Sequence, residues 1–320
     1  MKTKTLLGIT LLLLLHLTSC SSKASVNNET LETRTISVCT EDDDLGETIK
    51  QTLDLKDFHA IKASTGIEIF YTPGKEYTVV FEGKEKYLKQ HTFNVSNGML
   101  TIKRKSVAAT VGKRGNFQLH ITAPNIDRLY NEGSMAFHTT QWSAQSIDIS
   151  NDGDFTLYAN IRCYKNLHIH NDGAFAFRQG SVKAYSVTVD NDGASTITVP
   201  FEVKQDLNMK NDGSSKLSGK IKASTYKEEC DGAAKDSLDI EADNMWLNIN
   251  GAGQGSFTFK GKIADIKGDG SSKLNLTVDC EQLRVKSDGS SRITVKGTAD
   301  NTHFESDGVT KVDASELNNI

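Results

Sequence analysis

Acidic side chains recur at one fixed place in a repeated phrase of this 320-residue chain. Each stands directly before a glycine, and the phrases return every 19 or 20 residues. If the phrases stack, the carboxylates form a column of oxygen ligands, which could bind Ca²⁺. Each phrase offers one carboxylate, whereas Ca²⁺ takes about six to eight oxygens. We therefore expect each Asp to cap its own bend, without a metal or cofactor. The residues of this turn column are Asp152, Gly153, Asp172, Gly173, Asp192, Gly193, Asp212, Gly213, Asp231, Gly232, Asp269, Gly270, Asp288, Gly289, Asp307 and Gly308.

Histidines and aromatic residues give two further candidate sites. His168 and His170 share one strand face, and we expect them to lie next to His138 of the preceding repeat. Three imidazoles could bind a transition metal, although we favour unconnected surface histidines. Aromatic side chains could form an exposed strip that stacks on sugar rings, or could pack partly in the core or at the edges of the repeats, which we favour. They are Tyr158, Tyr164, Tyr185 and Trp142.

The repeats themselves must position these residues. Ten bends run from Asn131-Glu132-Gly133 to Ser306-Asp307-Gly308 at intervals of 20 and then 19 residues. A fixed period of this length is typical of a solenoid, and apolar residues alternate with polar ones on either side of each bend. We therefore predict an all-β, parallel β-solenoid (β-helix) of about ten 19–20-residue rungs, with two strands per rung. Antiparallel hairpins are the alternative, but they would need a second regular turn in each repeat.

Two features of the rungs follow from this stacking. Asn residues in the first five bends would form an amide ladder along the stack. The rung around Gly232 is predicted to be the weakest because polar residues occupy inward positions there. The ladder residues are Asn131, Asn151, Asn171, Asn191 and Asn211, and the inward residues of the weak rung are Tyr226, Glu228, Ala234 and Asp236.

The first 56 residues carry targeting signals. Residues 1–20 combine two lysines with a short apolar run and end in Leu-Thr-Ser-Cys, which resembles a bacterial lipobox. We predict a lipoprotein signal peptide and a lipid-modified Cys20, which would anchor the chain to a membrane. An ordinary signal peptide that contains a cysteine is the alternative. Residues 21–56 are polar and acidic, and we expect a flexible tether.

Residues 57–125 lack the repeat and are predicted to form an N-terminal β cap of hairpins. One hairpin is expected from Gly66–Tyr71 and Tyr77–Phe81, and another flanks Asn97-Gly98. Residues 126–320 are assigned to the solenoid repeats. No comparable cap follows them, so the C-terminal edge is expected to pair with a second copy, giving a homo-oligomer.

Charge and cysteine content narrow the possible partners. The net charge is −4, which argues against a basic nucleic-acid footprint, and we expect no nucleic-acid partner. Beyond Cys20 we expect four isolated cysteines, with a bond between Cys39 and Cys230 as the least implausible exception. No paired spacing typical of a metal site is present. The four residues are Cys39, Cys163, Cys230 and Cys280.

Residues 57–310 resemble the "putative auto-transporter adhesin, head GIN domain" family of bacterial envelope proteins. The resemblance lies in Phe58-His59-Ala60-Ile61, Gly66-Ile67-Glu68-Ile69, Asn97-Gly98-Met99-Leu100-Thr101-Ile102, Ala123-Pro124 and the repeated Asp-Gly-Ser/Ala bends, with departures at Glu132 and Asn250. It implies a right-handed parallel β-helix on a secreted or lipid-anchored protein, and it brings no catalytic or binding residues.

Two function hypotheses of different classes follow. The first, which we favour, is a non-enzymatic cell-envelope lipoprotein, an adhesin or binding scaffold whose faces bind a polysaccharide or a protein partner. The outer membrane is the expected location, with the periplasmic or surface face left open. The second is a β-helix carbohydrate-active enzyme, a polysaccharide lyase or hydrolase. Such an enzyme needs converging acid and base groups in a groove, whereas rungs of 19–20 residues leave no room for groove-forming loops.

Overall fold

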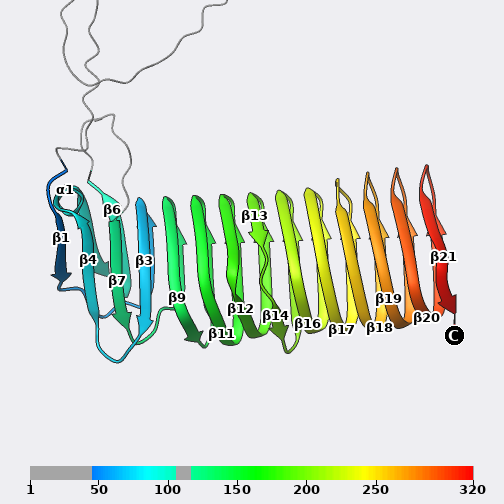
Figure 1. Ribbon diagram of the computed structural model, residues 1–320, viewed down its shortest axis with the longest axis horizontal. Coiled ribbons are helices and arrows are strands. Elements are labelled where there is room, and N and C mark those ends of the chain that lie inside the picture. Colours follow the sequence, from blue (N-terminus) through cyan, green and yellow to red (C-terminus); the bar gives the residue numbers. More distant parts are fainter. Residues whose placement is uncertain (1–44, 106–116, 320) are drawn as a thin grey trace, which may run out of the picture. The chain divides into compact units, whose positions relative to one another are not determined.

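The computed structural model describes residues 45–105 and 117–319. Within these ranges the chain forms 21 strands and one short helix, α1 (Glu85–Gln90). The strands wind into a parallel β-solenoid of about ten turns with rungs of about 19 residues. Figure 1 shows the rungs standing in one row from the blue β1 (Thr48–Leu53) to the red β21 (Lys311–Asn319). The predicted fold class is confirmed.

Long strands run from one bend to the next and pair in parallel with their neighbours. In β11 (Asp154–Asn171) and β12 (Ala174–Asn191), Phe155 lies opposite Phe175 and Leu167 lies opposite Val187. Equivalent positions of successive rungs therefore stack on one another. Every second residue along a strand is apolar and packs into one continuous core. The other strands of the stack are β8 (Arg128–Asn131), β9 (Ser134–Ala144), β10 (Ile147–Asn151), β13 (Ala194–Ile197), β14 (Phe201–Val203), β15 (Asp206–Asn211), β16 (Ser214–Cys230), β17 (Ala233–Ile249), β18 (Gln254–Gly268), β19 (Lys273–Ser287) and β20 (Arg292–Ser306).

The rung around Gly232 has the inward residues that the alternation predicts. Tyr226, Glu228, Ala234 and Asp236 are all buried. Two carboxyl groups therefore lie inside a core that elsewhere is almost wholly apolar, and their hydrogen bonds decide how well this rung is held.

The N-terminal segment extends the same stack in an order that differs from the chain order. Strands β2 (Ala60–Ser64) and β3 (Gly66–Pro73) pair in parallel with β8 and β9 on one side. On their other side they pair in parallel with β6 (Met99–Arg104) and β7 (Phe117–Ala123). Residues predicted only to cap the solenoid thus supply two further layers with rung-like pairing.

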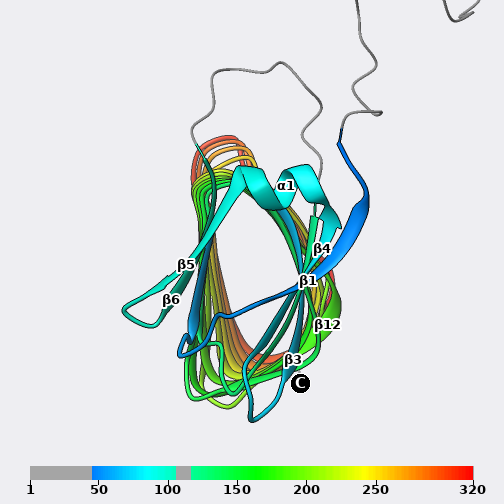
Figure 2. The same cartoon turned by 90° about the vertical axis from the view of Figure 1, so that its left-hand side faces the viewer.

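Antiparallel strands follow these layers at the end of the stack. β4 (Thr78–Lys84) pairs with β7, and β1 pairs with the far edge of β4. Helix α1 lies at this end of the coil, as Figure 2 shows in a view along the stack. Its Tyr87 and Leu88 pack against the core. No helix among the described residues is long and apolar enough to cross a membrane.

Two local expectations need correction. The hairpin predicted between Gly66–Tyr71 and Tyr77–Phe81 does not form, because β7 lies between β3 and β4. Parallel pairing with β9 brings Ile67 and Ile69 into the core column of the rungs, which a local hairpin would not do. The flexible tether predicted for residues 21–56 also extends too far toward its C-terminal end, because Thr48–Leu53 forms strand β1. Most side chains of β1 are exposed, so no apolar alternation marked it.

The second predicted hairpin is confirmed. β5 (His91–Ser96) pairs antiparallel with β6, and Ser96 lies opposite Met99. Asn97 and Gly98 between them have φ angles of 51° and 74°, the left-handed values that a tight two-residue hairpin turn requires.

Candidate functional site

The bends of the turn column stack directly on one another. At the third bend, the Asp172 amide donates to the Asn151 carbonyl at 2.8 Å, and the Ala174 amide donates to the Gly153 carbonyl at 2.8 Å. The same bonds recur at the bends before and after it. Parallel hydrogen bonding therefore continues through the corners and holds all of the Asp-Gly phrases in line.

Glycine is needed in most of these bends for close approach. A Cβ atom on Gly173 would lie 2.0 Å from the Gly153 carbonyl oxygen, and the bends at Gly193 to Gly251 are similarly tight. Positive φ angles occur only in the last three bends, at Gly270 (74°), Gly289 (77°) and Gly308 (72°). The last three bends therefore need glycine for its backbone conformation as well, and Gly270 needs it for both reasons.

The predicted amide ladder is present beside the turn column. Asn131, Asn151, Asn171 and Asn191 each donate from Nδ2 to Oδ1 of the next Asn, at 2.6 to 2.7 Å. Each Nδ2 also contacts the carbonyl of the glycine in its own bend. The ladder ends where Asn211 donates to the Cys230 sulfur at 3.4 Å. Because every ladder side chain is buried, these bonds satisfy groups that water cannot reach.

Most Asp side chains of the turn column are exposed, and three of them contact basic side chains of the strand before their own bend. Asp172 lies 3.2 Å from His170, Asp212 lies 2.8 Å from Lys210, and Asp269 lies 3.0 Å from Lys267. Among the described bends, capping by Asp is seen only where Gly289 and Gly308 donate backbone hydrogen bonds to the preceding Asp. The expectation that each Asp caps its own bend is therefore wrong for the earlier bends, and at the first of them the Gly133 amide donates to Asn131 Oδ1. Within residues 45–105 and 117–319, no group of three or more His, Cys, Asp or Glu side chains is arranged to hold a metal ion.

The three histidines do not form one cluster. His168 lies between Asp148 and Asp190, at 3.6 Å and 3.0 Å. His138 belongs to the strand that follows its bend, whereas His168 and His170 precede theirs, so the two sets lie on different columns of the stack. The expectation that His138 adjoins the other two histidines is therefore wrong.

His138 instead belongs to a ladder of planar rings that the sequence reading missed. The ring centroids of His120 and Phe70 are 5.1 Å apart, those of Phe70 and His138 are 4.7 Å apart, and those of His138 and Tyr158 are 4.5 Å apart. Adjacent rings are within 15° of parallel. The ladder depends on β3 lying between β7 and β9, an order that the chain order does not show.

Of the four aromatic residues that could form a strip, two are packed against the protein, as the favoured interpretation expects, and two are exposed. Trp142 is fully buried, and its indole N–H donates to the Ile126 carbonyl at 2.6 Å. One face of Tyr158 is covered by His138. Tyr164 and Tyr185 remain, with 57% and 46% of their surface exposed.

Tyr164 and Tyr185 lie on neighbouring rungs at one corner of the solenoid. The residues directly before them, Cys163 and Ala184, are paired in the parallel register. Among the described residues no aromatic ring stacks on either tyrosine, and both keep exposed surface that a ligand could contact. We call this surface the Tyr164/Tyr185 face.

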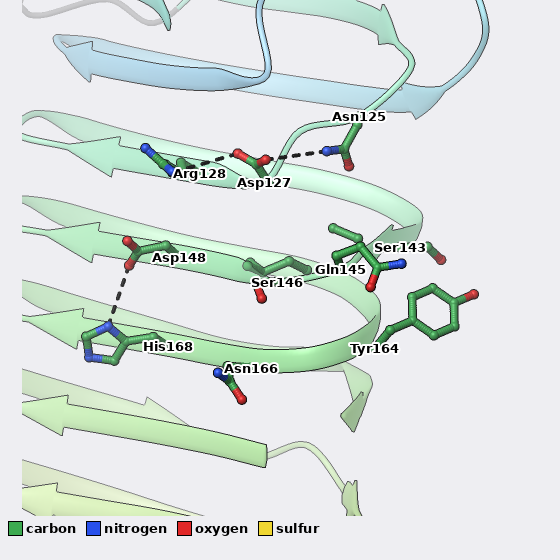
Figure 3. A pocket seen from close by; sticks show the side chains of 12 residues that line it. Asn125, Asp127, Arg128, Ser143, Gln145, Ser146, Asp148, Tyr164, Asn166 and His168 are labelled. Atoms are coloured by element: carbon green, nitrogen blue, oxygen red, sulfur yellow. Dashed lines mark hydrogen bonds and ion pairs between the residues drawn. The ribbon is translucent and has the colours of Figure 1, made fainter. Parts of the chain in front are cut away.

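Two shallow grooves meet at the Tyr164/Tyr185 face. The first has a volume of about 700 Å³, and Figure 3 shows Tyr164 projecting at its edge, with His168 and Asp148 further along. The second has a volume of about 650 Å³ and contains both tyrosines. Its charged lining residues are Arg162, Lys183, Glu202, Lys204, Lys222 and Asp243.

Each carboxylate that lines these grooves contacts a basic side chain. In the first groove, Asp127 lies 2.9 Å from His59, and Asp148 contacts His168. In the second, Lys183 beside Glu202 and Lys262 beside Asp243 hold the pKa of those carboxyl groups below their usual range. The lowered pKa values of Glu202 and Asp243 suit structural ion pairs and do not suit general-acid catalysis.

The cysteines in the described part are Cys163, Cys230 and Cys280, and all three are buried free thiols. Burial raises the pKa of Cys230 and of Cys280 to about 11. This environment supports the interpretation that these cysteines are unreactive small residues of the core. Cys20 and Cys39 lie outside the described residues.

Comparisons with solved structures give bacterial proteins of low sequence identity. A putative adhesin from Bacteroides fragilis is 14% identical with a TM-score of 0.41, and the match covers 84% of this chain and 97% of that one. A putative lipid binding protein from Parabacteroides distasonis is 14% identical (TM-score 0.39, 84% and 97% covered). A putative adhesin from Parabacteroides merdae is 15% identical (TM-score 0.37, 84% and 96% covered). None of the curated proteins matches the sequence.

A family comparison covers nearly all of the solenoid. Residues 57–264 and 252–319 match the family described as "Putative auto-transporter adhesin, head GIN domain". The matched residues begin just before β2 and end in β21. They make up well over half of the sequence. The chain therefore belongs to the auto-transporter adhesin, head GIN domain family.

Proposed function

We propose that this protein is a non-enzymatic binding lipoprotein of the bacterial cell envelope, whose Tyr164/Tyr185 face binds a polysaccharide. Membership of an adhesin family supports an extracellular or envelope-associated protein. The Leu-Thr-Ser-Cys sequence supports lipid attachment at Cys20, and with it a place on the outer membrane.

The observation that carries this proposal is the open pair of tyrosine rings on adjacent rungs. An exposed aromatic ring gains apolar contact when a sugar ring stacks on it, at about 25 cal/mol per Å² of apolar surface buried. Rungs one layer apart hold the two tyrosines at a fixed spacing, which suits successive units of an extended polymer. Shallow grooves on both sides leave room for a chain that runs across the rungs.

The groove chemistry supports binding without turnover. The lining carboxylates already have basic partners, and those of the second groove have lowered pKa values. A glycosidase needs a protonated acid opposite a free carboxylate. No such pair lines these two grooves among the described residues, so we expect polysaccharide to be released unchanged.

Binding to a glycan array tests the proposal. Detergent-solubilised full-length protein is expected to bind polysaccharide, and Tyr164→Ala/Tyr185→Ala is expected to bind about tenfold more weakly or not at all. Trp246→Ala is the matched control because Trp246 is 46% exposed on a different column of the stack. Equal loss in both variants, or binding only to a protein, would contradict the proposal, and release of reducing ends from a bound polysaccharide would contradict the non-enzymatic part.

A further inference from the structure

We infer that the polysaccharide held at the Tyr164/Tyr185 face is anionic, with carboxylate or sulfate groups that contact Arg162 and Lys204. This inference rests on the proposed function. It names the chemical class of the ligand, which the family does not provide.

Lys204 extends the tyrosine column by one rung, and Arg162 lies beside Tyr164 on the same rung. Arg162 lies two residues before Tyr164 on the outer side of β11 and is paired in register with Lys183. Lys204 occupies the position on the next rung that is equivalent to Tyr185, because the Lys204 amide donates to the Ala184 carbonyl at 3.0 Å. All four side chains line the second groove. A ligand lying over both rings would therefore meet Arg162 beside the first ring and Lys204 beyond the second.

Arg162 and Lys204 have no ionic partner of their own in the described part of the chain. The other two lysines of the groove are engaged, since Lys183 contacts Glu202 and Lys222 contacts Glu241. A lysine beside a carboxylate has part of its charge neutralised, whereas a cation without such a neighbour presents its full charge to a ligand. The free positive charge of the groove is thus concentrated at Arg162 and Lys204.

The balance of charge in this groove is opposite to that of the whole chain. Four basic side chains and two acidic ones line it, although the chain carries a net charge of −4. Lys183 forms a salt bridge with Glu202 and lowers the pKa of Glu202 most, and the charges of Lys222 and Arg162 add smaller contributions. A local potential of this sign favours an anionic partner over a neutral one.

The first groove does not share this character. It contains Asp127, Asp148 and Arg128 with His168, so acidic side chains balance or exceed the basic ones there. An anionic chain is therefore expected to extend from Tyr164 across Tyr185 toward Lys204, and not toward Asp148.

Four polymers separate the contributions of charge and ring. Dextran sulfate and dextran share a backbone and differ in sulfate, polygalacturonate carries carboxylates on sugar rings, and poly-L-glutamate carries carboxylates without rings. Full-length protein in detergent is expected to bind dextran sulfate and polygalacturonate about tenfold tighter than dextran or poly-L-glutamate. This preference should weaken as the salt concentration rises from about 0.05 M to about 0.5 M.

Charge-reversal variants localise the effect. Arg162→Glu/Lys204→Glu is expected to weaken dextran sulfate binding by about tenfold or more. Lys216→Glu/Lys235→Glu makes the same change in net charge at two exposed lysines that are paired in register on adjacent rungs elsewhere, and it should leave binding unchanged. Circular dichroism of each variant confirms that the rungs remain folded.

Several results would overturn the inference. Equal affinity for dextran and dextran sulfate, with both reversal variants unaffected, would leave a sugar-binding face and remove the anionic specificity. Equal loss in the two reversal variants would show attraction by overall charge alone. Poly-L-glutamate binding as tightly as polygalacturonate would show that no sugar ring is recognised. Failure to bind any polysaccharide would count against the proposed function itself.

Discussion

The hydroxyl group of Tyr226 donates a hydrogen bond of 2.7 Å to the Glu228 carboxylate inside the solenoid. Glu228 is also hydrogen-bonded to Asp236, which lies beyond the bend at Gly232 and accepts a bond from the Leu217 amide at 3.1 Å. Burial, reinforced by the charge of Glu228, raises the pKa of Asp236 to about 10. One carboxyl group therefore keeps its proton at neutral pH, and the hydrogen bonds offset part of the cost of burying this pair.

Asp236→Asn is expected to stabilise the protein at alkaline pH. Folded Asp236 binds its proton more tightly than unfolded Asp236, so its contribution is greatest below pH 3.8 and is lost progressively as pH rises toward about 10. Asparagine can still donate to Glu228 and accept from Leu217, but it has no proton to lose. Thermal unfolding should show a gain of about 2 kcal/mol at pH 9 and little change at pH 4.

Asp239→Asn, three residues along the same strand, is the control because Asp239 is exposed. It should change the stability difference between pH 4 and pH 9 only slightly. The same shift for Asp236→Asn at both pH values would show that the proton of this pair does not set the pH dependence.

Gly173→Ala is expected to destabilise the solenoid by about 3 kcal/mol, because the added Cβ would overlap a backbone carbonyl that cannot rotate away. The midpoint of urea unfolding measures the effect. Ala174→Ser is the control, since serine occupies the equivalent position at Ser134 and Ser214. An unchanged midpoint for Gly173→Ala would mean that the bends are not stacked in contact.

Asn171→Ala is expected to cost about 2 to 3 kcal/mol of stability. Asn171 receives a hydrogen bond from Asn151 and gives one to Asn191, so its loss leaves two buried partners incomplete. Asn131 begins the ladder and has an Asn neighbour on one side alone, since Ala63 is its partner on the other. Asn131→Ala should therefore cost about half as much by urea unfolding. Equal costs would contradict a ladder with cooperative links.

Cys20→Ala is expected to abolish labelling by radioactive palmitate and to release the protein from the membrane fraction. Acyl chains hold a protein at a bilayer through about 0.8 kcal/mol per buried CH₂ group. Cys39→Ala keeps the lipobox and should still be labelled. Wild-type protein without label would show that residues 1–20 form an ordinary signal peptide.

Deletion of residues 306–320 is expected to abolish self-association. Strand β21 pairs with β20 alone among the described strands, and an unpaired edge can accept a strand from a second copy. Light scattering should show multimers of the full chain that disappear on deletion. A monomeric full chain at high concentration would rule out this edge as an interface.

Part of the structure was accessible from local patterns. The spacing of the Asp-Gly phrases predicts the rungs, the alternation around Gly232 predicts which side chains turn inward, and the Asn positions predict the ladder. Each of these features recurs with the period of the sequence repeat. A residue and its neighbour on the next rung therefore have a known separation in sequence. Stacking in register then follows from one period, and the sequence alone determined it.

Tertiary structure decided what depends on strand order and on exposure. The position of β7 between β3 and β4 brings His120, Phe70 and His138 into one ring ladder, although these residues follow no common period. Burial of Trp142 and exposure of Tyr164 likewise follow from which side of a corner faces the core. Such choices depend on the total surface buried by distant segments, and no local pattern encodes them.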